Sequence, residues 1–289
     1  MRVLMCPPQF IQIAYEINDH MDKRNPPQKQ LALKQWQGVV AKYAQLGIEM
    51  NFIEPDIISQ DMCFTANAAW LYNNKMILSN YGGDARIARQ KEVGLYKKWF
   101  EKYQAEFPEM EVMFFPEHNM PFDGQGDVVT VPTNNLKEQP IILMGYGSGR
   151  TDRRAAEVLR KVHNLPKWRV VPLKLTNGLF YHLDTCCVAI GENVMLYYAG
   201  AFDNRALRAI HSLGMDTIPV SEKDAHNFVC NGVSVPTSGA TRFIVHKMSA
   251  KLRVKLIKRN IEVIETNTSE FLKNGGSVRC LTLILPERK

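Results

Sequence analysis

The chain has 289 residues, of which 45% are hydrophobic and 22% are charged, and its formal net charge is +7. This composition is that of an ordinary globular protein, so a disordered chain and a fibrous repeat protein are excluded. No run approaches the roughly eighteen apolar residues of a membrane-spanning helix, so an integral membrane protein is excluded as well. The densest basic run, residues 251–259, alternates with apolar residues as a solvated helix face does, so nucleic-acid binding is not expected.

The predicted elements begin with a buried strand at Val3–Cys6, where the apolar stretch is too short for a secretory signal. Helices are expected where apolar residues recur at helical spacing, at residues 31–46, 85–103, 153–163, 205–213 and 247–259. Short apolar runs rich in β-branched and aromatic residues lie between them and indicate strands. No linker divides the sequence, so one domain over residues 1–289 is expected.

The six cysteines are scattered along the chain without the C-x-x-C pairs that are typical of metal sites. Cys186 and Cys187 are adjacent, which is a poor geometry for a disulfide. In a chain of this length the pattern predicts reduced thiols and a cytoplasmic protein. Closely grouped His or Cys ligands are missing, so neither a metal nor another cofactor is expected.

The apolar runs recur as pairs of strands joined by a turn. The first pair turns at Asn73-Asn74, a residue type that tolerates the positive φ of a tight hairpin. The last run, residues 281–285, is expected to pair with the strand at the start of the chain. A polar residue stands in front of each unit; these are Asn67, Asp127, Asp184, Asn231 and Cys280, at separations of 60, 57, 47 and 49 residues.

A period near fifty residues predicts a propeller or an array of supersecondary units. Five units closed in a ring would point the five leading polar residues at a shared axis. So many polar groups are not buried without a ligand, and the axis would therefore be a functional site. The alternative is a two-layer α/β domain in which these residues only form turns; the spacing and the chemistry together favour the ring.

Three segments carry residues suited to catalysis. Cys280 follows a glycine pair and would open a hydrophobic strand; His182 and Asp184 would lie on one side of an extended chain. Asp123 and Asp127 straddle glycines that let the backbone aim both carboxylates at one point. Each segment has a plain structural reading: a buried cysteine, a hydrogen-bonded core histidine and a simple turn.

Together the three segments indicate more than each does alone. A cysteine nucleophile, a histidine acid/base and several carboxylates suit attack on a planar, positively charged carbon such as that of a guanidinium. Carboxylates bind a guanidinium through paired hydrogen bonds, and the bound cation lowers the pKa of a nearby thiol.

With these motifs the chain resembles the guanidine-modifying (amidinotransferase, or pentein) superfamily, whose fold is a five-bladed α/β propeller with pseudo-five-fold symmetry. The likeness is strongest to the catalytic domain of bacterial arginine dihydrolases and covers nearly the whole chain. The matching stretches are residues 5–8, 17–21, 35–37, 64–68, 123–127, 180–186, 198–203, 227–231 and 275–283.

The resemblance implies a role for each matching residue. Cys280 would form the covalent amidino-thioether, His182 would donate and accept the proton, and Asp123 would be the acidic member of the triad. Asp184 would bind the guanidinium and Arg150 the substrate α-carboxylate. The remaining substrate-binding residues would be Asn18, Asn67, Asp127 and Asn231.

The chain departs from the family pattern at two positions. The acidic triad member is usually Glu in the hydrolases, and Asp123 is one methylene shorter. Catalysis is sensitive to displacements of about 1 Å, so this change bears on the reaction. A family arginine reads Asn80 here, for which Arg86 or Arg89 could substitute.

Asn67 stands where deiminases and dimethylargininases carry Asp and where dihydrolases carry Asn. An amide can donate to a neutral ureido oxygen, which favours an arginine dihydrolase that makes ornithine, two ammonia and carbon dioxide. The alternatives are arginine deiminase or dimethylargininase, an amidinotransferase, and a non-catalytic pentein binder such as the ribosome-associated initiation factors. Dihydrolases with a second domain for ornithine chemistry are much longer than this chain. The expected partner is a small-molecule substrate, and the sequence leaves a homo-oligomer open.

Overall fold

The computed structural model describes residues 1–132, 140–237 and 239–286, without the side chains of residues 84–86. Within this part the strands form five three-stranded sheets of one pattern. The first two strands of each sheet pair antiparallel, and the third strand runs parallel to the middle one. In chain order of their first strands the sheets are β3 (Ala69–Tyr72), β4 (Lys75–Leu78), β5 (Glu111–Phe114); β6 (Val128–Val131), β7 (Ile141–Tyr146), β8 (Val170–Lys174); β9 (Cys187–Ile190), β10 (Val194–Tyr197), β11 (Asp216–Pro219); β12 (Val233–Pro236), β13 (Thr241–Val245), β14 (Ile261–Glu265); and β15 (Leu283–Leu285), β1 (Arg2–Met5), β2 (Glu49–Phe52).

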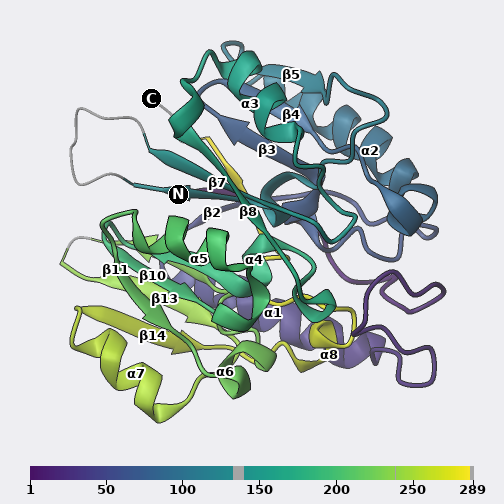
Figure 1. The fold of residues 1–289 in the computed structure, drawn as a ribbon. Helices are drawn as coiled ribbons and strands as arrows, with labels where there is room; N and C mark the ends of the chain where they lie inside the picture. The colour runs from purple at the N-terminus through teal and green to yellow at the C-terminus, as the bar shows by residue number, and fades with distance from the viewer. Residues whose placement is uncertain (133–139, 238, 287–289) are drawn as a thin grey trace.

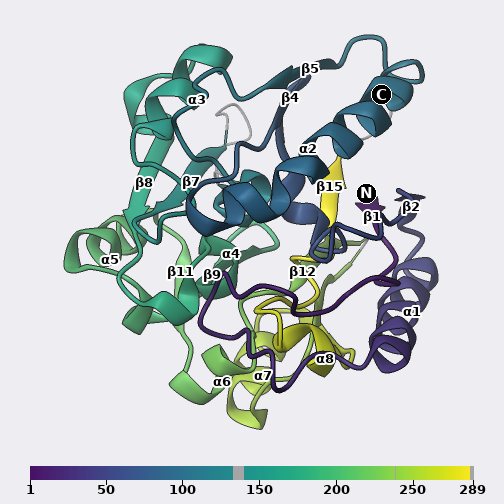
Figure 2. The same cartoon turned by 90° about the vertical axis from the view of Figure 1, so that its right-hand side faces the viewer.

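The five sheets confirm the predicted five-bladed α/β propeller. The ring closes as expected, because β15 at the end of the chain pairs antiparallel with β1, placing Val3 opposite Ile284. The first hairpin turns at Asn73, whose φ is 52°, in agreement with the predicted turn. Figure 2 shows the first strands β9, β12 and β15 towards the centre of the molecule, with helices such as α1, α3 and α5 at its periphery, and Figure 1 shows the same molecule turned by 90°.

The third strand of every sheet was not predicted from the sequence. Each is four or five residues long and follows a helix, because a strand can run parallel to its predecessor only after a crossover. The helices are α1 (Lys29–Gln45), α2 (Gly83–Gln104), α3 (Ala155–His163), α4 (Leu183–Cys186), α5 (Asn204–His211), α6 (Glu222–His226), α7 (Ala250–Ile257) and α8 (Ser269–Leu272). The five helices expected from periodicity correspond to α1, α2, α3, α5 and α7.

The core lies on both faces of the blades, as β1 illustrates. Val3 and Met5 point to one face and pack in the same cluster as Trp36 and Tyr43 of α1. Leu4 points to the other face and joins the cluster of the next blade. Strands buried on both faces carry apolar residues at every position, so alternation could not reveal them.

One local expectation was wrong. Residues 180–186 do not run as an extended chain, because α4 begins directly after His182 and the strand begins only at Cys187. The Asp127 carboxylate accepts a hydrogen bond from the Leu183 backbone N–H at 3.0 Å, and Thr185 Oγ1 donates to the His182 carbonyl. The helical turn is thus stabilised by a side chain from a preceding blade, which the local sequence does not show.

The predicted reduced thiols are confirmed, since all six cysteines are free. Among the described residues, no helix combines the length and the apolar character needed to cross a membrane.

Candidate active site

The five leading polar residues lie at the heads of the first strands, as the repeat predicted. Asn67 lies in the 3₁₀ turn before β3, and Asp184 lies in α4 before β9. All five are buried, the most exposed being Asn67 at 5%. Three of them, Asp184, Asn231 and Cys280, are in direct contact.

Cys280 is held by an amide and faces a carboxylate. Asn231 Nδ2 donates to Cys280 Sγ at 3.1 Å, while Asn231 Oδ1 accepts from the Cys280 backbone N–H at 3.2 Å. The thiol donates to Asp184 Oδ2 at 3.4 Å. A Cβ on Gly276 would lie 2.5 Å from the Phe64 ring and 3.1 Å from Cys280 Cβ, so only glycine fits in front of the thiol.

The thiol is protonated in the free protein. Burial raises the pKa of Cys280 well above its ordinary value, the Asp184 carboxylate raises it further, and the Asn231 amide opposes both. A cation bound beside Asp184 would cancel the repulsion that a thiolate meets there. This arrangement ties ionisation of the thiol to the arrival of a positively charged ligand.

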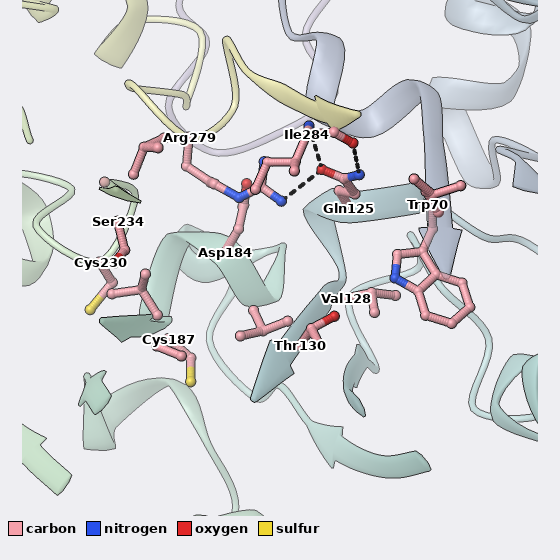
Figure 3. A pocket seen from close by; sticks show the side chains of 16 residues that line it. Trp70, Gln125, Val128, Thr130, Asp184, Cys187, Cys230, Ser234, Arg279 and Ile284 are labelled. Carbon is pink, nitrogen blue, oxygen red and sulfur yellow. Dashed lines mark hydrogen bonds between the residues drawn. The ribbon is translucent and has the colours of Figure 1, made fainter. Parts of the chain in front are cut away.

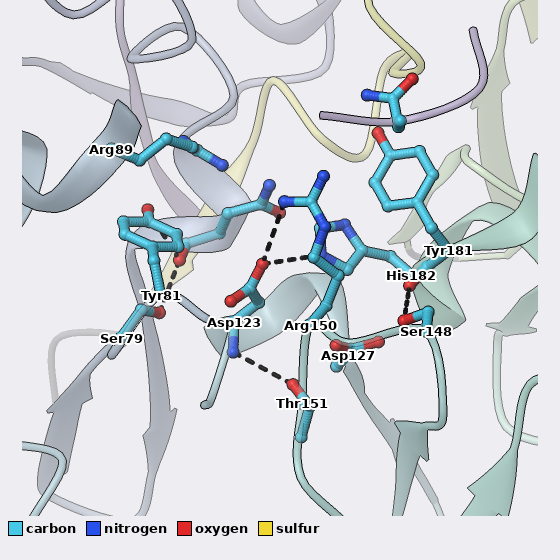
Figure 4. Close-up of polar contacts among 12 residues, drawn as sticks. Ser79, Tyr81, Arg89, Asp123, Asp127, Ser148, Arg150, Thr151, Tyr181 and His182 are labelled. Atoms are coloured by element: carbon cyan, nitrogen blue, oxygen red, sulfur yellow. Dashed lines mark hydrogen bonds and ion pairs between the residues drawn. The ribbon is translucent and has the colours of Figure 1, made fainter. Parts of the chain in front are cut away.

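His182 and Asp123 form a second buried pair, shown in Figure 4. His182 Nε2 lies 2.9 Å from Asp123 Oδ2, and neither side chain has measurable exposure. Thr151 Oγ1 accepts from the Asp123 backbone N–H and holds the turn in place. The aspartate therefore reaches the histidine although its side chain is one methylene shorter than that of the glutamate usual in the hydrolases.

The free nitrogen of His182 points away from Asp123. Nδ1 is buried and has no hydrogen-bond partner among the described atoms. It lies 3.3 Å from the point where a Cβ on Gly126 would stand, and Asn67 Oδ1 lies 2.5 Å from the same point. The missing side chain of Gly126 thus leaves room between the histidine and the Asn67 amide.

A small cavity opens beside these groups. Among the predicted residues, its lining includes Asn18, Asn67, Arg150 and Cys280. Asp123, Asp127, His182, Asp184 and Asn231 are not part of this lining. Of these, Asp184 and Asn231 contact the lining residue Cys280, and His182 contacts Asp123.

Arg150 stands at the side of the cavity against three neighbours. Its Nη1 lies 3.7 Å from Asp123 Oδ2, its Nη2 donates to the Ile17 carbonyl, and its guanidinium lies 5.0 Å from the centre of the Tyr181 ring. On the far side, Asn18 Nδ2 donates to the Asn274 carbonyl at 3.1 Å. The N-terminal segment and the loop before Cys280 are thereby joined over the cavity.

Burial shifts two of the carboxyl groups strongly. It raises the pKa of Asp184 to about 7, against the opposing effect of Arg279. It raises the pKa of Asp127 to about 6, against the opposing effect of His182. Asp127 also has a structural task, since one of its oxygens is occupied by the Leu183 N–H.

Several buried oxygens around the site have no hydrogen-bond partner among the described protein atoms. They are Asp61 Oδ2, Asn67 Oδ1, Asp123 Oδ1, Asp127 Oδ2 and Asp184 Oδ1. Buried acceptors of this kind are costly unless something satisfies them. A guanidinium offers five N–H donors and no acceptor, and it would satisfy such a set.

Three further residues, Asp61, Tyr181 and Asn274, line the cavity and were not predicted from the sequence. Asp61 Oδ1 accepts from Asn274 Nδ2 at 3.5 Å, and Tyr181 donates to the Gly275 carbonyl at 2.7 Å. None of the three stands at the head of a strand, so the repeat gave no signal for them.

The arginine substitute expected for Asn80 is only partly present. Asn80 Nδ2 donates to the Glu117, His118 and Met120 carbonyls and so holds a loop. Arg89 lines the cavity, but its guanidinium is paired with the buried Glu92 carboxylate at 2.7 Å. The side chain of Arg86 lies outside the described residues. Where side chains are described, no group of three or more His, Cys, Asp or Glu could hold a metal ion.

Comparison with known proteins relates this site to one family. A family model described as eukaryotic N,N dimethylarginine dimethylhydrolase matches residues 11–285. The chain is 32% identical over 289 residues to the bifunctional arginine dihydrolase/ornithine cyclodeaminase AgrE of Nostoc, covering 99% of this chain and 38% of the relative. It is 31% identical to the N(G),N(G)-dimethylarginine dimethylaminohydrolase of Mycobacterium tuberculosis, covering 98% of this chain and 85% of that protein.

Solved structures agree with these sequence matches. The N-terminal domain of ArgZ, a cyanobacterial arginine dihydrolase crystallised with its substrate, superposes with a TM-score of 0.85 at 31% identity. The match covers 98% of this chain and 97% of that domain. Since the whole bifunctional relatives are much longer, the chain spans about two fifths of their length.

Proposed function

The chain belongs to the N,N-dimethylarginine dimethylhydrolase family, and on that premise we propose that it is a cysteine-dependent hydrolase acting on the guanidinium of arginine or a close derivative. The observation that carries the proposal is the set of unpartnered buried oxygens beside a buried thiol. The same set of oxygens favours a cationic substrate over a neutral amide.

In the proposed reaction the substrate guanidinium binds against Asp184 and lowers the pKa of Cys280. The thiol loses its proton to solvent, and the thiolate attacks the guanidinium carbon. His182 then donates a proton to the amino group, which leaves as ammonia. The product of this step is a covalent thiouronium on Cys280. His182, now neutral, takes a proton from water, which attacks the same carbon and releases citrulline with the thiol restored.

A second cycle would convert the ureido product further. Attack of Cys280 on the ureido carbon releases a second ammonia, and hydrolysis of the resulting thiocarbamate gives a carbamate that breaks down to ornithine and carbon dioxide. Asn67 supports this outcome because its amide can turn an N–H towards a neutral ureido oxygen. We therefore take arginine dihydrolysis as the main candidate.

The second candidate is hydrolysis of dimethylarginine to citrulline and dimethylamine. The matching family model and the mycobacterial relative favour it. The two candidates share the thiol, the histidine and the carboxylates, and they differ in the amine that leaves and in the number of cycles. An amidinotransferase, in which an amine replaces water, would use the same covalent intermediate.

A purely binding role is less consistent with the site. A non-catalytic pentein has no need of a thiol clamped by an amide and set against a carboxylate. The free thiols further suit a reducing compartment, and we place the protein in the cytoplasm as a single catalytic domain over residues 1–289.

Incubation of the purified protein with arginine or with asymmetric dimethylarginine tests the proposal directly. Chromatography of citrulline, ornithine, ammonia and dimethylamine separates the candidates. Ornithine and two ammonia per arginine would establish dihydrolysis, and citrulline alone would establish the one-cycle reaction. If the Cys280→Ser variant turns over either substrate as fast as the wild type, the covalent mechanism is wrong.

A further inference from the structure

A second cavity, of about 260 Å³, is lined in part by Asp184, whose carboxylate contacts the thiol of the first cavity. Figure 3 shows the side chains that line it, which include residues of the first strands of all five blades and residues of the turns that precede these strands. They include Trp70 of β3, Val128 of β6, Val233 of β12 and Ile284 of β15. Asp184 lines this cavity, while its partner Cys280 lines the first one.

The one cationic side chain in the lining of this second cavity is that of Arg279. Its Nη2 donates to Gln125 Oε1 at 2.9 Å, and its Nη1 donates to the Thr282 carbonyl. Gln125 is itself anchored on β15, because it binds both the N–H and the carbonyl of Ile284. The guanidinium of Arg279 is therefore fixed by two acceptors at known positions.

The backbone of Arg279 is fixed to the same loop as the thiol. Its N–H donates to the Asn231 carbonyl at 3.0 Å, and the next residue is Cys280. Asn231 thus connects the positions of Arg279, Cys280 and Asp184. Within the described residues, no carboxylate lies within ion-pair distance of Arg279.

We propose that Arg279 is a positioning residue for the guanidinium site: from the second cavity, which both side chains line, its positive charge favours the anionic form of Asp184 that a substrate cation needs. The inference rests on the proposed function, since it assigns Asp184 to the substrate. It explains why a permanently charged residue is placed behind a buried carboxylate that already faces a thiol. Without that charge, Asp184 would remain protonated at neutral pH and could not attract a cation.

The other groups around Asp184 do not supply this charge. Those that act on it or on its immediate neighbours are Cys280, Asn231, Tyr181, Cys186, Asp61, Asp123, Asp127, His182 and Arg150. Arg150 is a cation, but it acts on Tyr181 rather than on Asp184, and its Nη1 lies 3.7 Å from Asp123 Oδ2. Cysteine, tyrosine and aspartate are neutral or negative, and His182 is already paired with Asp123. Arg279 is the one permanent cation that acts on the Asp184 carboxyl and favours its ionisation.

The direct test is the titration of Asp184, followed by carbon-13 NMR of labelled aspartate carboxyls and assigned by the signal that Asp184→Asn removes. The neutral variants are Arg279→Met, which keeps the apolar stem, and Arg279→Gln, which keeps a donor for the Gln125 oxygen. Either variant serves if it shows a cooperative unfolding transition. We expect the midpoint of Asp184 to rise by about one pH unit, which is a tenfold change in its ionisation equilibrium.

Two further variants separate charge from packing. Arg279→Lys keeps the charge and should leave the midpoint near that of the wild type. Arg169→Met removes a buried arginine that lies against Trp168 and outside both cavities, and it should leave Asp184 unchanged. An unchanged midpoint in a folded neutral variant would overturn the proposal, as would an equal rise in Arg169→Met.

Kinetics supply a second readout that packing alone would not move. In the neutral variants the acidic limb of the pH profile of kcat/KM for arginine should move to higher pH by about one unit. At high pH, where Asp184 is ionised in every variant, kcat/KM should return to the wild-type value. A loss of equal size at every pH would contradict the proposal. If the wild type hydrolyses no guanidine, the proposed function fails, but the NMR titration still decides whether Arg279 sets the charge of Asp184.

Discussion

The two cavities on either side of Asp184 are built from the same five blades but differ in chemistry. The first is lined by polar residues such as Asp61, Asn67 and Arg150, whereas the second is lined mainly by apolar strand residues such as Val128 and Val233. The residues that precede the first strands carry polar side chains to one side, and the strands themselves present apolar side chains on the other. Position along the blade therefore decides which cavity is polar and which is apolar.

The two cavities also differ in the surroundings of their cysteines, Cys187 in the second and Cys280 in the first. Cys187 lines the second cavity, and burial alone raises its pKa to about 12. Cys280 is equally buried, but it contacts the Asp184 carboxylate and the Asn231 amide. Burial raises the pKa of both thiols, and of the two only Cys280 has a carboxylate beside it at which a cation could bind. Reactivity is thus a property of the neighbours rather than of the residue type.

The largest expected effect comes from exchanging the sulfur atoms. Cys280→Ser should reduce turnover of arginine by at least about a thousandfold, because a serine hydroxyl is far less ionised than a thiol at neutral pH. Cys187→Ser, the matched change in the second cavity, should keep most of the activity. Steady-state ammonia release measures both variants, and thermal unfolding checks that each is folded. An equal loss of activity in both variants would contradict the assignment of Cys280, rather than Cys187, as the nucleophile.

The next effect concerns the carboxylate that separates the two cavities. Asp184→Asn should lower kcat/KM for arginine by about a hundredfold, since lost charge-assisted hydrogen bonds cost about 1.5–3 kcal/mol each. For the wild type, kcat/KM should rise as pH passes through about 7, where Asp184 becomes anionic. A pH profile of the wild type without a limb in this region would contradict the assignment.

The same substitution should make the free protein more stable at high pH. The pKa of Asp184 is raised from 3.8 to about 7 by burial, so its contribution to stability is fully present below pH 4 and is lost as pH rises through 7. Asp184→Asn removes this loss, so its melting temperature should equal that of the wild type near pH 4 and exceed it near pH 8. Differential scanning calorimetry measures the difference, which should have the opposite sign to the change in activity.

A smaller effect is expected at Arg150, on the side of the polar cavity. Arg150→Ala should weaken binding of arginine by about 1.5–3 kcal/mol, the cost of one lost charge-assisted hydrogen bond to the substrate α-carboxylate. Agmatine lacks that carboxylate and should lose much less. Inhibition constants for both ligands measure the difference. Equal losses would show that Arg150 acts only through Asp123, which lies 3.7 Å away.

The smallest effect should appear in the products rather than in the rate. Asn67→Asp should shift the products towards citrulline, because a carboxylate strengthens binding of the cation and repels the ureido oxygen of the second cycle. An unpaired buried acceptor costs about 1–3 kcal/mol, so the second cycle should slow by about tenfold or more. Chromatography of citrulline and ornithine gives the ratio. If the variant keeps the wild-type ratio, another residue sets the number of cycles.

Local patterns predicted a large part of this molecule. The hairpins, their turns and the residues that precede them are separated by few residues, so the repeat of polar residue, strand, turn and strand could be read directly. It located Asn67, Asp127, Asp184, Asn231 and Cys280 at the heads of the strands. The parallel third strands were not predicted. A strand such as β5 has only four residues, and it is stabilised by pairing with β4, from which the helix α2 separates it in the sequence.

The same limit explains the errors and omissions at the site. The turn at His182 was expected to be extended, and the helical turn forms because Asp127 binds the Leu183 N–H from 56 residues away. No local sequence pattern distinguishes Asp61 or Arg279, because their proposed roles depend on the groups that lie near them in the folded chain.

By itself, the sequence determined the number of blades, the closure of the ring and the residue types at its centre, because these depend on period and composition along the chain. Only the tertiary structure decided which groups meet: the pairing of His182 with Asp123, the clamp of Asn231 on Cys280, and the separation of the two cavities by Asp184. Electrostatic interactions and hydrogen bonds act over a few ångströms. The residues that lie this near to one another come from different blades and are separated by tens to hundreds of positions in the sequence. Their energies therefore exist only once the ring has folded.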